Sequence, residues 1–231
     1  HKALQYVDDD WVNWTEEYNQ GLENLYRDFT VINDKATTTA DDYSKRLHDG
    51  YEWIQIHCHA NHSAKRHAFK LNDGPKGSGG NFNSRDLYEN GQKSLFSNIF
   101  TCGSANYSVD NYLCGWYTLT DNYGLASIGT TKPGGMLNFK DYYEPLLEGK
   151  SIGEAMKEWW KDHGETNRWW FYGMTTIGDP TLSPGYLYED SGKKDYLPHS
   201  PIRIDSNNNF HNQAVSQSWP GNGTEDDPYI I

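Results

Sequence analysis

Two short apolar runs that each lead into a reactive side chain most constrain how this chain can fold. Residues 53–57 lead into Cys58 and His59, and residues 97–101 lead into Cys102. Short apolar runs bounded by small polar residues are typical of buried strands. Because α/β enzymes place their functional groups where such strands end, the two runs predict a thiol nucleophile with a histidine as its acid/base partner.

Further strands and helices alternate along the chain. Apolar runs predict strands over residues 3–7, 29–32, 124–129 and 171–177, and helical spacing predicts helices over 14–26, 43–47, 111–119 and 151–162. The last helix should begin with a capping box of Ser151 and Glu154 and should bury Trp159 or Trp160. Residues 72–83, rich in Gly, Asn, Pro and Lys, predict a mobile surface loop. The alternation predicts an α/β fold with a mostly parallel sheet covered on both faces.

The composition changes after residue 182. Residues 183–231 contain several prolines, an Asn run at 207–209 and few apolar residues. We therefore predict one domain over residues 1–183, with a boundary near 184–200, and a linker or the start of a following module over 184–231.

Charge and length exclude several classes of protein. The 231 residues carry a formal net charge of -12, which argues against nucleic acid and anionic membranes as partners. No run of 18 apolar residues is present, so we expect no membrane span. Because position 1 is His rather than Met, we expect a fragment of a longer chain. The acidic, Trp- and Tyr-rich composition is compatible with an extracellular setting.

The three cysteines are too few, and odd in number, for a disulfide framework. Cys58 and Cys114 lie in apolar surroundings and are predicted to be core residues. Cys102, at a strand end before Gly-Ser, is predicted to be the reactive thiol.

Two metal sites are alternatives to this interpretation. The cluster of His57, Cys58, His59, His62 and His67 has zinc-type ligands but includes no carboxylate. The run Asp8-Asp9-Asp10 is either a solvated turn, a calcium site through Asp8 and Asp9, or part of a specificity pocket.

Several segments together carry a resemblance to a known family. The histidine strand, residues 99–106 around Cys102, the strand 125–129 with Thr130-Thr131 after it, and residues 178–182 (Gly-Asp-Pro-Thr-Leu) resemble gingipain-like cysteine peptidases of the caspase and gingipain clan. The similarity covers roughly residues 3–182. Residues 221–231 separately resemble the lead-in to the β-helix modules of surface proteins.

The resemblance implies a caspase-like three-layer α/β/α sandwich in which Cys102 attacks the peptide carbonyl and His59 protonates the leaving amine, with no cofactor required. Backbone N–H groups of Ala60 and Cys102 would hold the oxyanion, although the family has Gly where this chain has Ala60. His57 competes with His59, because alternation along a strand puts both on one face.

The resemblance also bears on the substrate, which is a polypeptide. Asp10 at the end of the first strand would receive a basic residue before the scissile bond, whereas Thr131 and Lys132 lie in the loop that shapes the same pocket and Lys132 would favour an acidic residue. We predict a basic residue and an extracellular or cell-surface location. A catalytically silent adhesion or scaffold module is the alternative function, and the oligomeric state, homo-oligomers included, stays open.

Overall fold

The computed structural model describes residues 1–60, 65–70, 78–184, 206–216, 219 and 221–224. The chain divides into two units, His1–Glu189 and Asp190–Ile231. In the second unit the described residues include one helix, α9 (Asn207–Ser216), and the Phe210 ring packs against Trp219 at 5.8 Å between ring centroids. That this unit leads into a β-rich module stays a prediction.

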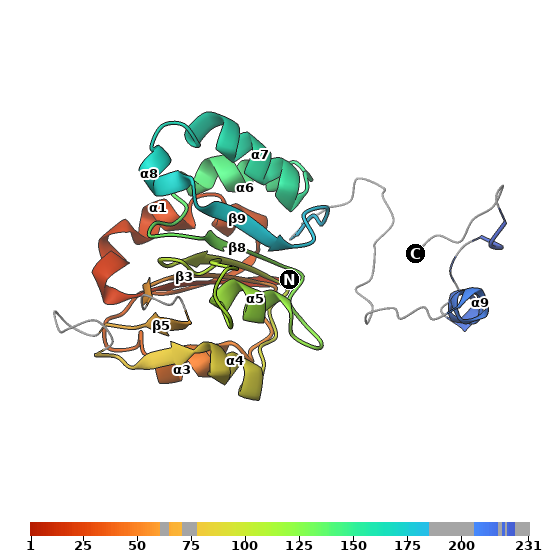
Figure 1. The fold of residues 1–231 in the computed structure, drawn as a ribbon, viewed down its shortest axis with the longest axis horizontal. Helices are drawn as coiled ribbons and strands as arrows, with labels where there is room; N and C mark the ends of the chain where they lie inside the picture. The colour runs from red at the N-terminus through yellow and green to blue at the C-terminus, as the bar shows by residue number, and fades with distance from the viewer. Residues whose placement is uncertain (61–64, 71–77, 185–205, 217–218, 220, 225–231) are drawn as a thin grey trace. The chain divides into compact units, whose positions relative to one another are not determined.

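A six-stranded sheet forms the centre of the first unit, in the order β2-β1-β3-β7-β8-β9 (Figure 1). Its strands are β1 (Lys2–Val7), β2 (Asp28–Ile32), β3 (Trp53–His57), β7 (Phe96–Phe100), β8 (Ala126–Thr130) and β9 (Met174–Gly178). The first five strands run parallel and β9 pairs antiparallel with β8. Every residue of β3, β7 and β8 is buried, as expected for a parallel sheet covered on both faces.

Helices cover both faces of this sheet (Figure 1). In the described part of the chain, six helices pack on one face of the sheet. They are η1 (Asp9–Trp14), α1 (Thr15–Asn19), α2 (Leu22–Leu25), α6 (Phe139–Leu147), α7 (Ile152–His163) and α8 (Arg168–Phe171). The second layer, on the other face, contains α3 (Ala40–Arg46), α4 (Ser84–Asn90) and α5 (Leu113–Thr118). The predicted α/β sandwich with a mostly parallel sheet is therefore confirmed.

A small antiparallel sheet in the order β4-β5-β6 adds to the second layer. It consists of β4 (His59–Ala60), β5 (Arg66–Ala68) and β6 (Asn81–Asn83). Because Asn81–Asn83 are a strand, the prediction of a loop over 72–83 is wrong at its end, and residues 72–77 lie outside the described part of the chain.

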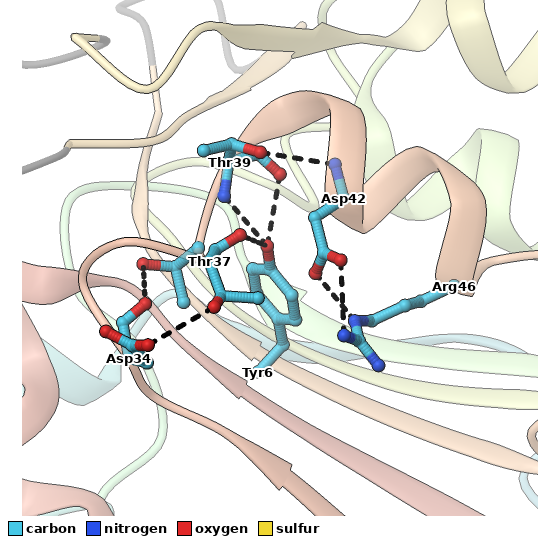
Figure 2. Close-up of polar contacts among 7 residues, drawn as sticks. Tyr6, Asp34, Thr37, Thr39, Asp42 and Arg46 are labelled. Atoms are coloured by element: carbon cyan, nitrogen blue, oxygen red, sulfur yellow. Dashed lines mark hydrogen bonds and ion pairs between the residues drawn. The ribbon is translucent and has the colours of Figure 1, made fainter.

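Tyr6 of β1 fixes the segment that connects β2 to α3 (Figure 2). Its buried hydroxyl accepts the N–H of Thr39 at 2.9 Å and donates to the Thr39 carbonyl at 3.0 Å. The Thr39 side chain accepts the N–H of Asp42 at 3.2 Å and so caps α3. An ion pair between Asp42 and Arg46, at 2.6 Å, follows one turn later.

Two predicted elements differ most from their expected form. The helix expected over 14–26 is interrupted at Gly21, whose φ of 88° is left-handed and whose added Cβ would lie 2.5 Å from the Cβ of Tyr143. Tyr18, Leu22 and Leu25 are nevertheless buried, as their spacing predicts. The strand expected over 171–177 begins only at Met174, because Phe171 ends α8.

Candidate active site

The predicted histidine and cysteine follow neighbouring strands at the same edge of the sheet. His57 ends β3 and pairs in register with Phe100, which ends β7. The N–H of Cys58 donates to the Phe100 carbonyl at 3.2 Å, so the two segments stay paired one residue beyond β3. His59 and Cys102 each come two residues after this pair. Cys102 is an exposed free thiol.

A carboxylate holds the His59 side chain, and an ammonium group pairs with that carboxylate. The Nε2 atom of His59 lies 2.6 Å from Asp10 Oδ2, and the other oxygen of Asp10 pairs with Lys70 Nζ. The Trp11 ring lies 5.5 Å from the imidazole between centroids. Burial alone would raise the pKa of Asp10, but the hydrogen bonds from Lys70 and His59 outweigh it and hold that pKa below its usual range. Asp10 is thus an anion beside His59.

His57 belongs to the core instead. Its ring stacks on Tyr18 with 3.8 Å between centroids and an interplanar angle of 4°, and it also contacts Phe100 and Phe139. Neither ring nitrogen has a hydrogen-bond partner among the described residues, and burial lowers the pKa of His57 well below its ordinary value. The two histidines also do not share one strand, because β3 ends at His57 and β4 begins at His59. The accessible imidazole at this edge is therefore His59.

The loop after β8 lies against the loop that carries Cys102. The N–H of Gly103 donates to the Lys132 carbonyl at 2.9 Å, and the N–H of Ala105 donates to the Thr130 carbonyl at 3.0 Å. The N–H of Thr131 donates to the Gly173 carbonyl at 2.8 Å. The structure thus brings both predicted pocket residues of this loop beside the cysteine loop.

The ammonium group of Lys132 has contacts within the protein. Its Nζ donates to the Arg168 carbonyl at 3.1 Å and lies 6.0 Å from the centroid of the Tyr172 ring. These contacts tie the loop after β8 to the segment around α8.

Ala60 lies in β4, opposite His67 of β5. His67 is buried, and its Nε2 lies 3.2 Å from the hydroxyl of Tyr117. The backbone at Ala60 is thereby attached to a buried aromatic layer. The role of the Ala60 and Cys102 N–H groups in holding an oxyanion stays a prediction.

Asp8 and Asp9, which the sequence offers as calcium ligands, differ from each other. The Asp8 carboxylate accepts the N–H groups of Lys70, at 3.0 and 2.9 Å, and of Asp9, at 3.0 Å, and burial raises its pKa to about 7. Asp9 is buried, and its Oδ1 has no hydrogen-bond partner in the described part of the chain. A calcium ion at these residues stays a prediction.

The alternative of a zinc cluster has little support in the geometry. Within the described ranges, no three His, Cys, Asp or Glu side chains gather in a way that could hold a metal ion. His62 lies outside those ranges. Cys58 and Cys114 are buried, as predicted, and burial raises the pKa of both thiols, that of Cys114 to about 12.

Sequence reasoning missed two groups at this edge, Lys70 and Trp11. Lys70 follows β5, a strand of three residues that shows no clear pattern in the sequence. Trp11 lies in a short 3-10 helix. The available signal in the sequence was its position directly after the Asp8-Asp9-Asp10 run, which follows a buried strand.

Comparisons with known proteins agree with this fold. No family model matches the chain, and no curated protein matches it. A crystal structure of the Arg specific cysteine proteinase gingipain R (RGPB) is similar with a TM-score of 0.57 and 11% identity over 79% of this chain and 47% of that chain. The complex of Porphyromonas gingivalis RgpB pro- and mature domains gives a TM-score of 0.56 and 10% identity over 79% of this chain and 48% of that chain.

The chain thus spans about half the length of the gingipain chains it resembles. It has a gingipain/caspase-like fold, and at this level of identity the likeness concerns the fold. Among the described residues, no helix has the length and apolar character needed to cross a membrane.

Proposed function

We propose that the protein is a cysteine endopeptidase whose peptidase domain is residues 1–183. The observation that carries the proposal is the placement of Cys102 and His59 after adjacent parallel strands, with the His59 imidazole bound to the Asp10 carboxylate. A nucleophile, a base and a group that orients the base are the parts that nucleophilic catalysis requires. The gingipain/caspase-like fold and the cysteine proteinases that share it support the same function.

In the proposed mechanism, Asp10 fixes the tautomer of His59. Because Nε2 donates its proton to the Asp10 carboxylate, the other ring nitrogen serves as the acceptor for the Cys102 proton. The thiolate attacks the peptide carbonyl, and protonated His59 then gives its proton to the leaving amine. Water hydrolyses the thioester with His59 as the base. This cycle requires no cofactor, and a calcium ion at Asp8 and Asp9 would have a structural role.

The oxyanion would be held by the N–H groups of Ala60 and Cys102. Alanine keeps the N–H that its family counterpart, glycine, supplies, so the hydrogen bond is retained while the added Cβ narrows the space beside it. We expect a restricted choice of substrates rather than a loss of activity.

The proposed substrate is a polypeptide with a basic residue before the scissile bond, encountered outside the cell or at its surface. Asp10 would bind the basic side chain in place of Lys70, whose ammonium group it accepts in the structure. Thr131 and Lys132 would line the other side of the pocket. Gingipain R, which shares the fold, is an Arg specific cysteine proteinase, and this supports the same preference.

A catalytically silent surface module that keeps the peptidase fold is the second candidate. Ala60 favours it, because a side chain stands where the family has only a hydrogen atom.

Labelling with an acyloxymethyl ketone probe separates the two functions. We expect rapid modification of Cys102, identified by mass spectrometry, because His59 withdraws the thiol proton. Cys58 and Cys114 should not react, since both are buried. His59→Ala should slow labelling by about 100-fold or more, the usual contribution of an acid/base group.

His57→Phe is the matched control for the histidine change, because phenylalanine keeps the ring that stacks on Tyr18, and it should leave the labelling rate of Cys102 close to that of the wild type. Equal labelling of Cys102 in wild type and His59→Ala, together with no cleavage of an unstructured substrate, would favour the silent module.

A further inference from the structure

A hollow of about 370 Å³ lies at the edge of the sheet opposite Cys102. Its walls come from the end of α4, from the segment that leads into β7, and from the segment 119–123 between α5 and β8. These segments precede the strands, whereas Cys102 follows β7, so the hollow is separate from the candidate active site. Its volume falls in the range of small-molecule pockets, about 300–1,000 Å³.

Aromatic rings line this hollow and are open to solvent. Tyr88 is 69% exposed, and its ring meets Trp116 edge to face with 5.1 Å between centroids. Tyr123 is exposed on the segment after α5. A second hollow of about 240 Å³, lined also by Tyr112, shares Trp116 and Leu119 with the first. Because the two hollows share these residues, they adjoin, and together they have room for more than one ring-sized group.

The polar lining is rich in amides and balanced in charge. Asn90 and Asn122 supply side-chain amides, which both donate and accept hydrogen bonds. Glu89 is paired with Arg85 at 2.7 Å, and Asp121 has Lys93 on the same lining. Neither an anionic nor a cationic ligand is therefore favoured.

The floor and rim are preorganised. The buried side chain of Gln92 donates to the carbonyls of Ser94 and Tyr117, both at 3.0 Å. The hydroxyl of Thr120 donates to the Tyr123 carbonyl at 2.8 Å and fixes the turn that carries Tyr123. A preorganised site loses less conformational freedom when it binds a ligand.

We propose that this hollow is a binding site for a neutral oligosaccharide. A pyranose ring has an apolar C–H face that packs on an exposed aromatic ring, and hydroxyl groups that pair with amides and carboxylates. The cores of protein–protein interfaces are depleted of charged residues, whereas Glu89, Lys93 and Asp121 line this hollow. The site is independent of the proposed peptidase activity.

The test is isothermal titration calorimetry of the 231-residue chain with cellohexaose, xylohexaose, chitohexaose and mannohexaose. We expect at least one of these neutral hexasaccharides to bind and a heparin hexasaccharide, which is polyanionic, not to bind. Tyr88→Ala should weaken binding by roughly tenfold, as expected when a central aromatic contact is removed. Tyr107→Ala is the matched control, because Tyr107 is 68% exposed and lines neither hollow.

Three results would overturn the proposal: no binding of any neutral hexasaccharide, equal affinity of wild type and Tyr88→Ala, or binding of heparin in preference to the neutral sugars. A casein hydrolysate that binds at Tyr88 while the sugars do not would assign the hollow to a polypeptide and would also overturn it.

Discussion

At the scale of single residues, Asp10 has the largest influence on the candidate site. Its two oxygens contact different partners, His59 through one and Lys70 through the other. A change at this position therefore alters both the orientation of the His59 imidazole and the negative charge beside it. Asparagine in place of Asp10 would keep the size of the side chain and one hydrogen-bonding group, and would remove the charge.

Substrate preference and turnover can be separated with Asp10→Asn and Lys132→Ala in a positional-scanning fluorogenic library. We expect the wild type to cleave after Arg or Lys. Asp10→Asn should lower turnover of every substrate by about 100-fold or more, because an imidazolium loses its counter-charge, and should weaken the preference for a basic residue. Lys132→Ala should leave the preference unchanged, since Lys132 Nζ is bound to the Arg168 carbonyl. Hydrolysis after Asp or Glu that Lys132→Ala abolishes would show that the lysine determines specificity.

At the scale of elements, α7 shows how one helix face attaches to the sheet. Trp159 is fully buried, its ring meets Phe171 edge to face at 5.0 Å, and its Nε1 donates to the Leu137 carbonyl at 2.8 Å. Trp160 is 37% exposed and stacks on Trp159. The two neighbours thus have the same chemistry but very different burial.

Replacing each tryptophan by alanine measures this difference. Trp159→Ala should lower the free energy of unfolding by about 3–5 kcal/mol, the cost of a large cavity in a core. Trp160→Ala should cost about 1 kcal/mol or less, as most partly exposed positions do. Urea unfolding followed by far-UV circular dichroism gives both values. Similar losses for the two variants would show that the helix face is assigned wrongly.

The same helix illustrates which elements could be predicted from the sequence. The capping box of Ser151 and Glu154 marks the start of α7, and continuous apolar runs mark β1, β3, β7 and β8, because local patterns determine these elements. Helix α6 gives a mixed signal, because its buried apolar residues have helical spacing while Pro145 inside it argues against a helix. The two- and three-residue strands β4, β5 and β6 are too short to show a period.

The candidate site was likewise predictable from the sequence only in part. That His59 and Cys102 follow buried strands is a local property of the sequence. Long-range contacts decide the rest: Asp10 and His59 are 49 positions apart in the chain, and Asp10 and Lys70 are 60 apart. No local pattern encodes those pairings, and the burial of His57 likewise depends on packing against α1 and α6.

At the scale of the whole molecule, buried ionisable groups determine how stability depends on pH. Burial lowers the pKa of His57 well below 6.5 and that of His67 to about 3, so both are neutral in the folded protein at mildly acidic pH. Burial raises the pKa of Asp8 from 3.8 to about 7, so Asp8 is protonated in the folded protein over the same range.

The two histidines and Asp8 change the free energy of unfolding in opposite directions as the pH rises. Counting these three groups alone, between about pH 4.5 and 6 the unfolded chain binds two more protons through the histidines and one fewer through Asp8, a net excess of one. Stability rises with pH wherever the unfolded state binds more protons. The free energy of unfolding should therefore increase by about 1.4 kcal/mol per pH unit across this window.

His57→Phe tests the origin of this slope. Phenylalanine keeps the ring that stacks on Tyr18 and has no nitrogen to leave unpaired in the core. With one histidine removed, the remaining histidine and Asp8 cancel, so the slope between about pH 4.5 and 6 should fall to near zero and the variant should exceed the wild type in stability at pH 5. Urea unfolding at a series of pH values measures the slope. At pH 8 the histidine is neutral in both the folded and the unfolded state, so the difference between variant and wild type there reports the change in packing alone. An unchanged slope in His57→Phe would mean that the pKa of His57 is the same in the folded and unfolded protein, contrary to its burial in the core.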